Sequence, residues 1–115
     1  MIKTRRVYEQ GDPGEKYRIL VDKFWPRGIS KERADWNEWM REIAPSDELR
    51  KWYHHEFSKW DEFRKLYGKE LAGKKESIDK LLKLEKEHGT ITFLYSSQEK
   101  EHNNATALKE FLTKK

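Results

Sequence analysis

Two short polar segments carry the side chains best suited to bind or transform a ligand. The first, residues 22–28, follows a predicted strand and reads Asp-Lys-Phe-Trp-Pro-Arg-Gly. Its Trp-Pro step stiffens the backbone and Gly28 can adopt a positive φ, so the loop can hold Arg27 toward an anion. Asp22 would then orient the guanidinium or act as a base. In the alternative interpretation, an Asp22–Arg27 ion pair closes the sheet and Trp25 is an ordinary core ring.

The second segment, residues 96–104, lies between a predicted strand and the last predicted helix. Its end places His102 and two asparagines at the start of that helix, where free N–H groups favour negative charge. A histidine there can act as a general acid or base near neutral pH. Alternatively, Asn103 and Asn104 only cap the helix and His102 is exposed.

Two early strands are predicted at residues 5–8 and 17–22, on either side of a turn-rich segment. The eight residues that join them are fewer than the roughly 10–12 that a parallel crossover needs. This short connection favours an antiparallel hairpin, which would place Arg5 or Arg6 close to Asp22.

The remaining elements are mostly helical. An apolar stripe at i, i+3, i+4, i+7 spacing predicts a first helix over residues 36–43. A buried strand is predicted at residues 90–95, parallel to the second strand because a long helical connection joins the two. We therefore expect an α/β domain with a small mixed three-stranded sheet, its second and third strands parallel, covered by about five helices. The expected helix caps and ends are Ser46, Ser58, Gly73, Gly89 and Asn103 or Asn104.

The composition limits the function classes. A length of 115 residues predicts a single domain over residues 1–115, and 25 Lys and Arg against 21 Asp and Glu favour anionic partners. The absence of cysteine excludes disulfides, thiolate metal sites and a cysteine nucleophile. No apolar run approaches the roughly 20 residues of a membrane span, so we expect a soluble, cytoplasmic protein. Nothing in the sequence requires a metal, although Asp22, His102 and a glutamate have the chemistry to assemble one.

The same segments carry a resemblance to a known family, the YeaO-like proteins, or domain of unknown function 488 (DUF488). This resemblance implies a compact bacterial or archaeal α/β domain whose two polar segments share one site. Lys23 stands where the family pattern has arginine, which loses the bidentate fork, and Ser96-Ser97 stands where the pattern has two alanines. The matching stretches are residues 6–8, 20–31, 43–46, 49–52 and 62–63, then Tyr67, residues 94–95 and residues 102–105.

These observations predict a domain that binds a small phosphate- or carboxylate-bearing ligand between Arg27 and the final helix. In this hypothesis Asp22 orients the ligand or accepts a proton, His102 donates one, and Arg6 and Lys31 add positive charge. The alternatives are a nucleic-acid-binding protein and a protein-interaction module. The sequence identifies no cofactor, reaction or oligomeric state. The remaining candidate ligand-binding residues are Trp25, Gly28, Ser96, Asn103 and Asn104.

Overall fold

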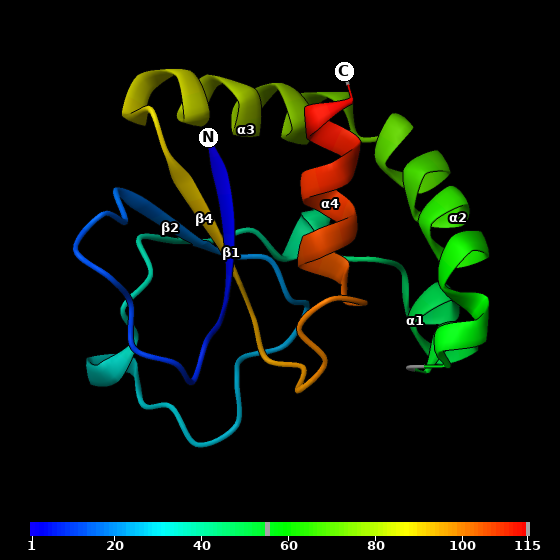
Figure 1. The fold of residues 1–115 in the computed structure, drawn as a ribbon, viewed down its shortest axis with the longest axis horizontal. Helices are drawn as coiled ribbons and strands as arrows, with labels where there is room; N and C mark the ends of the chain where they lie inside the picture. The colour runs from blue at the N-terminus through cyan, green and yellow to red at the C-terminus, as the bar shows by residue number, and fades with distance from the viewer. Residues whose placement is uncertain (55, 115) are drawn as a thin grey trace.

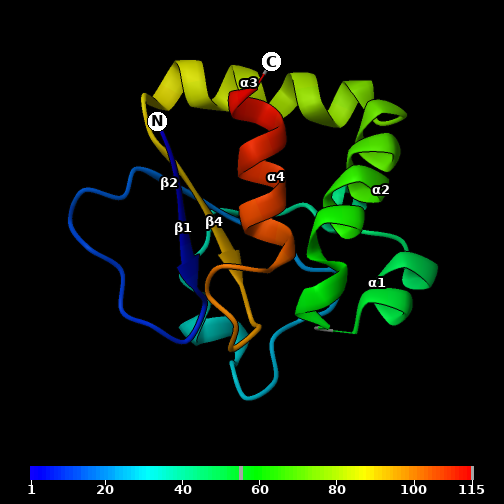
Figure 2. The same cartoon turned by 45° about the vertical axis from the view of Figure 1, so that its right-hand side comes forward.

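A parallel β-sheet forms the centre of the domain. The computed structural model describes residues 1–54 and 56–114, which form four strands, four α-helices and three short 3₁₀ helices. All strand pairs are parallel, and Arg6 lies opposite Tyr95 while Leu20 lies opposite Leu94, so the carboxyl ends align at one edge. Figure 2 shows β1 and β4 side by side, pointing away from α3. The strand order is β1 (Ile2–Arg6), β4 (Ile91–Tyr95), β2 (Tyr17–Leu20) and β3 (Glu38–Trp39).

The predicted mixed three-stranded sheet is wrong in two respects. The first strand pairs with β4 in parallel instead of forming a hairpin with β2, and β3 adds a fourth strand. Residues 7–16 can span about 30 Å when extended, whereas a return along a five-residue strand and across two strand spacings covers only about 20 Å. A helix is therefore not needed for this crossover. The predicted parallel direction of the second strand and the strand at residues 90–95 is confirmed, because β2 pairs with β4 in parallel.

The helices pack on one face of the sheet, and their apolar side chains form the main core with Ile19, Ile91 and Phe93. In Figure 1, α3 crosses one end of the strands and α4 stands beside the sheet. No helix among residues 1–54 and 56–114 has both the length and the apolar character needed to cross a membrane. The helices are α1 (Asp47–Tyr53), α2 (Trp60–Ala72), α3 (Lys75–His88) and α4 (Asn104–Thr113).

Loops cover the opposite face, where Leu20 and Leu94 pack against Trp36 and Trp39. Successive residues of a strand point to opposite faces, so residues 36–43 divide their apolar side chains between the two cores instead of forming one helical stripe. Met40 and Ile43 belong to the main core. The helix predicted over residues 36–43 is therefore wrong: the segment forms β3 and the short 3₁₀ helix η2 (Arg41–Ile43). The prediction of about five helices is wrong for the same reason, since the described residues form four α-helices.

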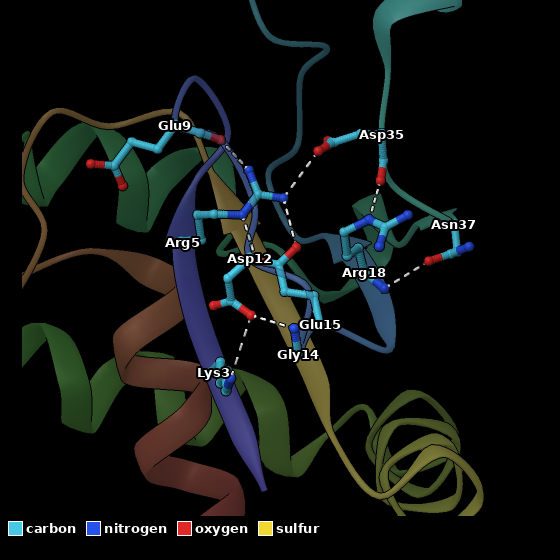
Figure 3. Close-up of polar contacts among 9 residues, drawn as sticks. All are labelled: Lys3, Arg5, Glu9, Asp12, Gly14, Glu15, Arg18, Asp35 and Asn37. Atoms are coloured by element: carbon cyan, nitrogen blue, oxygen red, sulfur yellow. Dashed lines mark hydrogen bonds and ion pairs between the residues drawn. The ribbon is translucent and has the colours of Figure 1, made fainter.

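Arg5 binds the loops to this second face. Its guanidinium forms a bidentate pair with Glu15 (2.6 and 3.1 Å), contacts Asp35 Oδ2 (3.1 Å) and donates to the Glu9 carbonyl (Figure 3). The side chain of Glu15 is only 4% exposed. Arg18 donates to the Asp35 carbonyl, so the connections that follow β1 and β2 are both held against this face.

Most of the predicted helix caps and ends agree with the structure. The Ser46 hydroxyl accepts a hydrogen bond from Leu49 N (3.1 Å) at the start of α1, and Asn103 Oδ1 accepts one from Thr106 N (2.9 Å) at the start of α4. The predicted cap at Ser58 is wrong, because α2 begins at Trp60 after the 3₁₀ helix η3 (Phe57–Lys59). The predicted helix ends at Gly73 and Gly89 are confirmed.

Candidate functional site

A cavity of about 860 Å³ opens at the carboxyl edge of the sheet. Its walls come from the segments that follow β1, β2 and β4, from the start of α4, and from α1 with the residues before it. Ligands of parallel sheets bind at this edge because loops and helix N-termini converge there. The polar and charged lining residues are Arg6, Asp22, Lys23, Arg27, Arg50, Lys51, His54, Ser96, Ser97, Gln98, Asn103 and Asn104.

The loop after β2 is held rigidly by aromatic side chains. Trp39 Nε1 donates to the Asp22 carbonyl (2.8 Å), Trp25 Nε1 donates to the Ile29 carbonyl (2.5 Å), and the Tyr8 hydroxyl donates to the Arg27 carbonyl (2.7 Å). Trp25 also packs edge-on against Trp39. The backbone of the Trp-Pro-Arg-Gly turn is therefore fixed, while the Arg27 side chain is exposed at the cavity.

Gly28 allows this turn. Its φ is +84°, a region that side chains disfavour by roughly 1–2 kcal/mol per residue. It does not line the cavity, so its contribution to the site is conformational.

Asp22 joins the two polar segments predicted to share a site. Its Oδ2 accepts hydrogen bonds from Ser96 N (2.9 Å) and Ser96 Oγ (2.7 Å), and its Oδ1 accepts one from Asn104 Nδ2 (3.1 Å). Asn104 Nδ2 also donates to the Val21 carbonyl (3.2 Å). Residues 22–28 and 96–104 therefore meet at one rim, and no Asp22–Arg27 ion pair forms among the described residues.

Positive charge dominates the cavity wall. Among the described lining residues, Asp22 is the only carboxylate, against the five cations Arg6, Lys23, Arg27, Arg50 and Lys51. The guanidinium of Arg27 and the ammonium of Lys51 form no hydrogen bond or ion pair with any residue in 1–54 or 56–114. Both cations are therefore available to a ligand.

Two other lining cations share one counter-ion just outside the wall. Asp47 pairs with Lys23 Nζ (2.7 Å) and Arg50 Nη2 (3.2 Å). The hydrogen bonds from these two cations lower the pKa of the Asp47 carboxyl below its usual value. Asp47 is therefore ionised at neutral pH and partly neutralises this side of the cavity.

Sequence reasoning missed Arg50 and Lys51. They lie on α1, far along the chain from both polar segments, and the only sequence signal for them is the family-like stretch at residues 49–52. Lys23 stands where the family pattern has arginine, so the sequence left an arginine-like role at this position in doubt. Lys23 does line the cavity.

Besides Gly28, two further predicted residues lie outside the cavity lining. Lys31 is exposed on the 3₁₀ helix η1 (Lys31–Arg33). The His102 ring packs edge-on against Trp60 and its Nδ1 lies 3.2 Å from Glu99 Oε1. The pKa of Glu99 is lowered by the backbone hydrogen bond from Glu101 and by the bonds from His102. These contacts favour a structural role for His102, and its proton-donor role stays a prediction.

The described residues contain no group of three or more His, Cys, Asp or Glu side chains placed to hold a metal ion. Asp22 and His102 therefore share no such cluster within residues 1–54 and 56–114. The arrangement can bind an anion through cations, amides and hydroxyls.

Comparison with known proteins confirms the family resemblance. A family model described as "Inactive DUF488-N3 subclade" matches residues 1–115. The chain is 40% identical to the uncharacterized protein YeaO of Escherichia coli (strain K12) over 111 residues, 96% of each protein. It is 46% identical to an uncharacterized protein of Mycobacterium tuberculosis (strain ATCC 25618 / H37Rv) over 70 residues, 61% of this chain and 59% of that relative. No solved structure gives a significant match. The chain therefore belongs to the DUF488 family, in the subclade whose description reads inactive.

Proposed function

We propose that this domain binds a small phosphate- or carboxylate-bearing ligand in the cavity and performs no acid–base chemistry on it. The observation that carries the proposal is the charge of the wall, where five cations and one carboxylate line the carboxyl edge of the sheet. A guanidinium such as that of Arg27 matches the geometry of phosphate and carboxylate oxygens. An anion would therefore gain charge-assisted hydrogen bonds there.

A binding role without catalysis is supported by the contacts of the two predicted acid–base residues. The carboxylate of Asp22 already accepts three hydrogen bonds from Ser96 and Asn104, so it holds residues 22–28 and 96–104 together. His102 lies outside the cavity lining. The family description, which contains the word inactive, supports a role without catalysis.

Titration with inorganic phosphate, followed by isothermal calorimetry and by thermal shift, tests this proposal. A ligand that binds only the folded state at 100 times its Kd stabilises that state by roughly 2.7 kcal/mol, which raises Tm. Arg27→Ala should weaken phosphate binding about tenfold or more, because a hydrogen bond to a charged group is lost. Arg33→Ala is the matched control: it makes the same charge change on an exposed arginine outside the cavity. If wild-type protein binds neither phosphate nor a simple carboxylate, or if both variants behave alike, the proposal fails.

Removal of Asp47 should have the opposite effect. Asp47→Asn releases Lys23 and Arg50 from their shared counter-ion, so phosphate affinity should rise about two- to threefold at low salt. The gain should shrink as ionic strength increases, since salt screens the interaction of exposed charges. Asp79→Asn, which makes the same charge change on the exposed face of α3, should leave affinity unchanged. Equal gains in both variants would indicate a general effect of net charge and contradict a local role.

A further inference from the structure

The cavity is larger than an inorganic anion can fill. Its volume of about 860 Å³ falls in the range of roughly 300–1,000 Å³ typical of sites for drug-sized organic molecules. A bare phosphate or acetate would contact only the cations and leave most of the wall in water. The natural ligand should therefore carry a larger organic group attached to its anionic group.

Exposed aromatic rings line the same wall. Phe24 is 55% exposed and Tyr8 is 43% exposed, although large apolar rings usually gain stability from burial. Trp25, the neighbour of Phe24, also lines the cavity, but it is half-buried because it packs against Trp36 and Trp39, whereas the Phe24 ring is left exposed. A planar ligand body could recover the apolar burial that Phe24 lacks.

These rings lie next to the cations that would bind the anionic group. The Arg50 guanidinium lies 5.1 Å and the Lys23 ammonium 5.9 Å from the centre of the Phe24 ring. The Arg6 guanidinium lies 4.7 Å from the centre of the Tyr8 ring, and the Tyr8 hydroxyl is fixed on the Arg27 carbonyl. One ligand can therefore contact a cation and an aromatic face together.

The wall also provides an amide for a polar edge. The Gln98 side chain is exposed at the cavity and makes no hydrogen bond with any residue in 1–54 or 56–114. An amide of this kind donates and accepts, so it can pair with the edge of a heterocyclic base. The cations suit a phosphate, the exposed aromatic rings suit a planar ring, and the free amide suits the polar edge of that ring.

Resting on the anion-binding function proposed above, we infer that the ligand is a nucleoside phosphate, whose base stacks on Phe24 while its phosphate contacts Arg27 and its neighbouring cations. Stacking of a base on an aromatic side chain is tolerant of base identity, because every base has a π-face. The cavity should therefore accept several nucleotides, with affinities that differ less from one another than from those of phosphates without a base.

Calorimetric titration with AMP, GMP, CMP and UMP, each compared with ribose 5-phosphate and inorganic phosphate, tests the inference. At least one nucleotide should bind wild-type protein about tenfold more tightly than ribose 5-phosphate. Phe24→Ala should remove this advantage and leave ribose 5-phosphate affinity within about twofold, while Phe24→Tyr should retain most of it, because only a planar ring is required. Phe24 lies outside both apolar cores, so the variant should keep the wild-type Tm, which circular dichroism verifies.

Trp52→Ala is the matched control, because Trp52 is an exposed aromatic residue that carries a cation, Lys59, over its ring but does not line the cavity. It should leave nucleotide affinity unchanged. Equal binding of all nucleotides and ribose 5-phosphate, or an unchanged advantage in Phe24→Ala, would overturn the inference while the anion site stands. Failure of every phosphate compound to bind would instead overturn the anion-binding function itself.

Discussion

Arg5→Ala should lower the free energy of unfolding by about 3 kcal/mol, because removing one partner of a buried ion pair leaves the other charge without compensation. Glu15, which is almost fully buried, would lose both hydrogen bonds of its bidentate pair. The Glu9 carbonyl and Asp35 would lose the same donor group. Urea denaturation followed by circular dichroism measures the change directly.

Two further variants separate the ion pair from a general effect of charge. Arg33→Ala, on the exposed surface, should change the free energy of unfolding by less than about 0.5 kcal/mol. The double variant Arg5→Ala/Glu15→Ala should be less destabilised than the sum of its two single variants, because the two side chains interact directly. Strict additivity, or a loss in Arg5→Ala below about 1 kcal/mol, would contradict a structural role for this pair.

Local sequence signals located most elements correctly. The Ser46 cap, the glycine after α3 and the β-branched and aromatic run of β4 all depend on neighbours close in sequence, and the structure confirms them. The helix prediction for residues 36–43 was wrong because the spacing of their apolar residues fits a helix and also fits two cores on opposite faces of a sheet. Only tertiary packing decides between the two, and here it selects β3 and η2.

The direction of the first strand was predicted from connection length alone. The strand is Ile2–Arg6 and runs parallel to its neighbour, where residues 5–8 in an antiparallel hairpin were expected. The two errors offset each other for Arg6. The prediction placed it near the start of an antiparallel strand, and the structure places it at the end of a parallel strand, so in both cases it lies at the carboxyl edge where the cavity opens. Nothing local reveals that Arg5 holds the crossover loop, since its partners are Glu9, Glu15 and Asp35.

The candidate site was predicted where it follows from strand ends. Residues 22–28 and 96–104 meet because parallel strands share a carboxyl edge, which the sequence pattern indicates. Arg50 and Lys51 come from α1, whose position over this edge depends on the packing of Leu49 and Tyr53 in the main core. Residue spacing predicts an apolar side for this helix, but it does not place that side relative to the carboxyl edge of the sheet.

Asp22→Ala should lower the free energy of unfolding by about 2 kcal/mol. The substitution removes the acceptor of three hydrogen bonds, from the Ser96 N–H, the Ser96 hydroxyl and the Asn104 amide. These bonds join the segment after β2 to the segment after β4. Water can reach this half-buried group and replace part of the loss, so the effect stays below that of Arg5→Ala.

Ser96→Ala is the graded control for this tie, because it removes one of the three hydrogen bonds and leaves the backbone donor in place. It should cost about 1 kcal/mol, and in the Asp22→Ala background it should cost much less, since the hydroxyl has already lost its acceptor. A catalytic carboxylate has no need of such coupling and could be replaced with little change in stability. If denaturant titration finds Asp22→Ala as stable as wild type, Asp22 does not join the two segments, and its oxygens are instead free for a ligand or a proton.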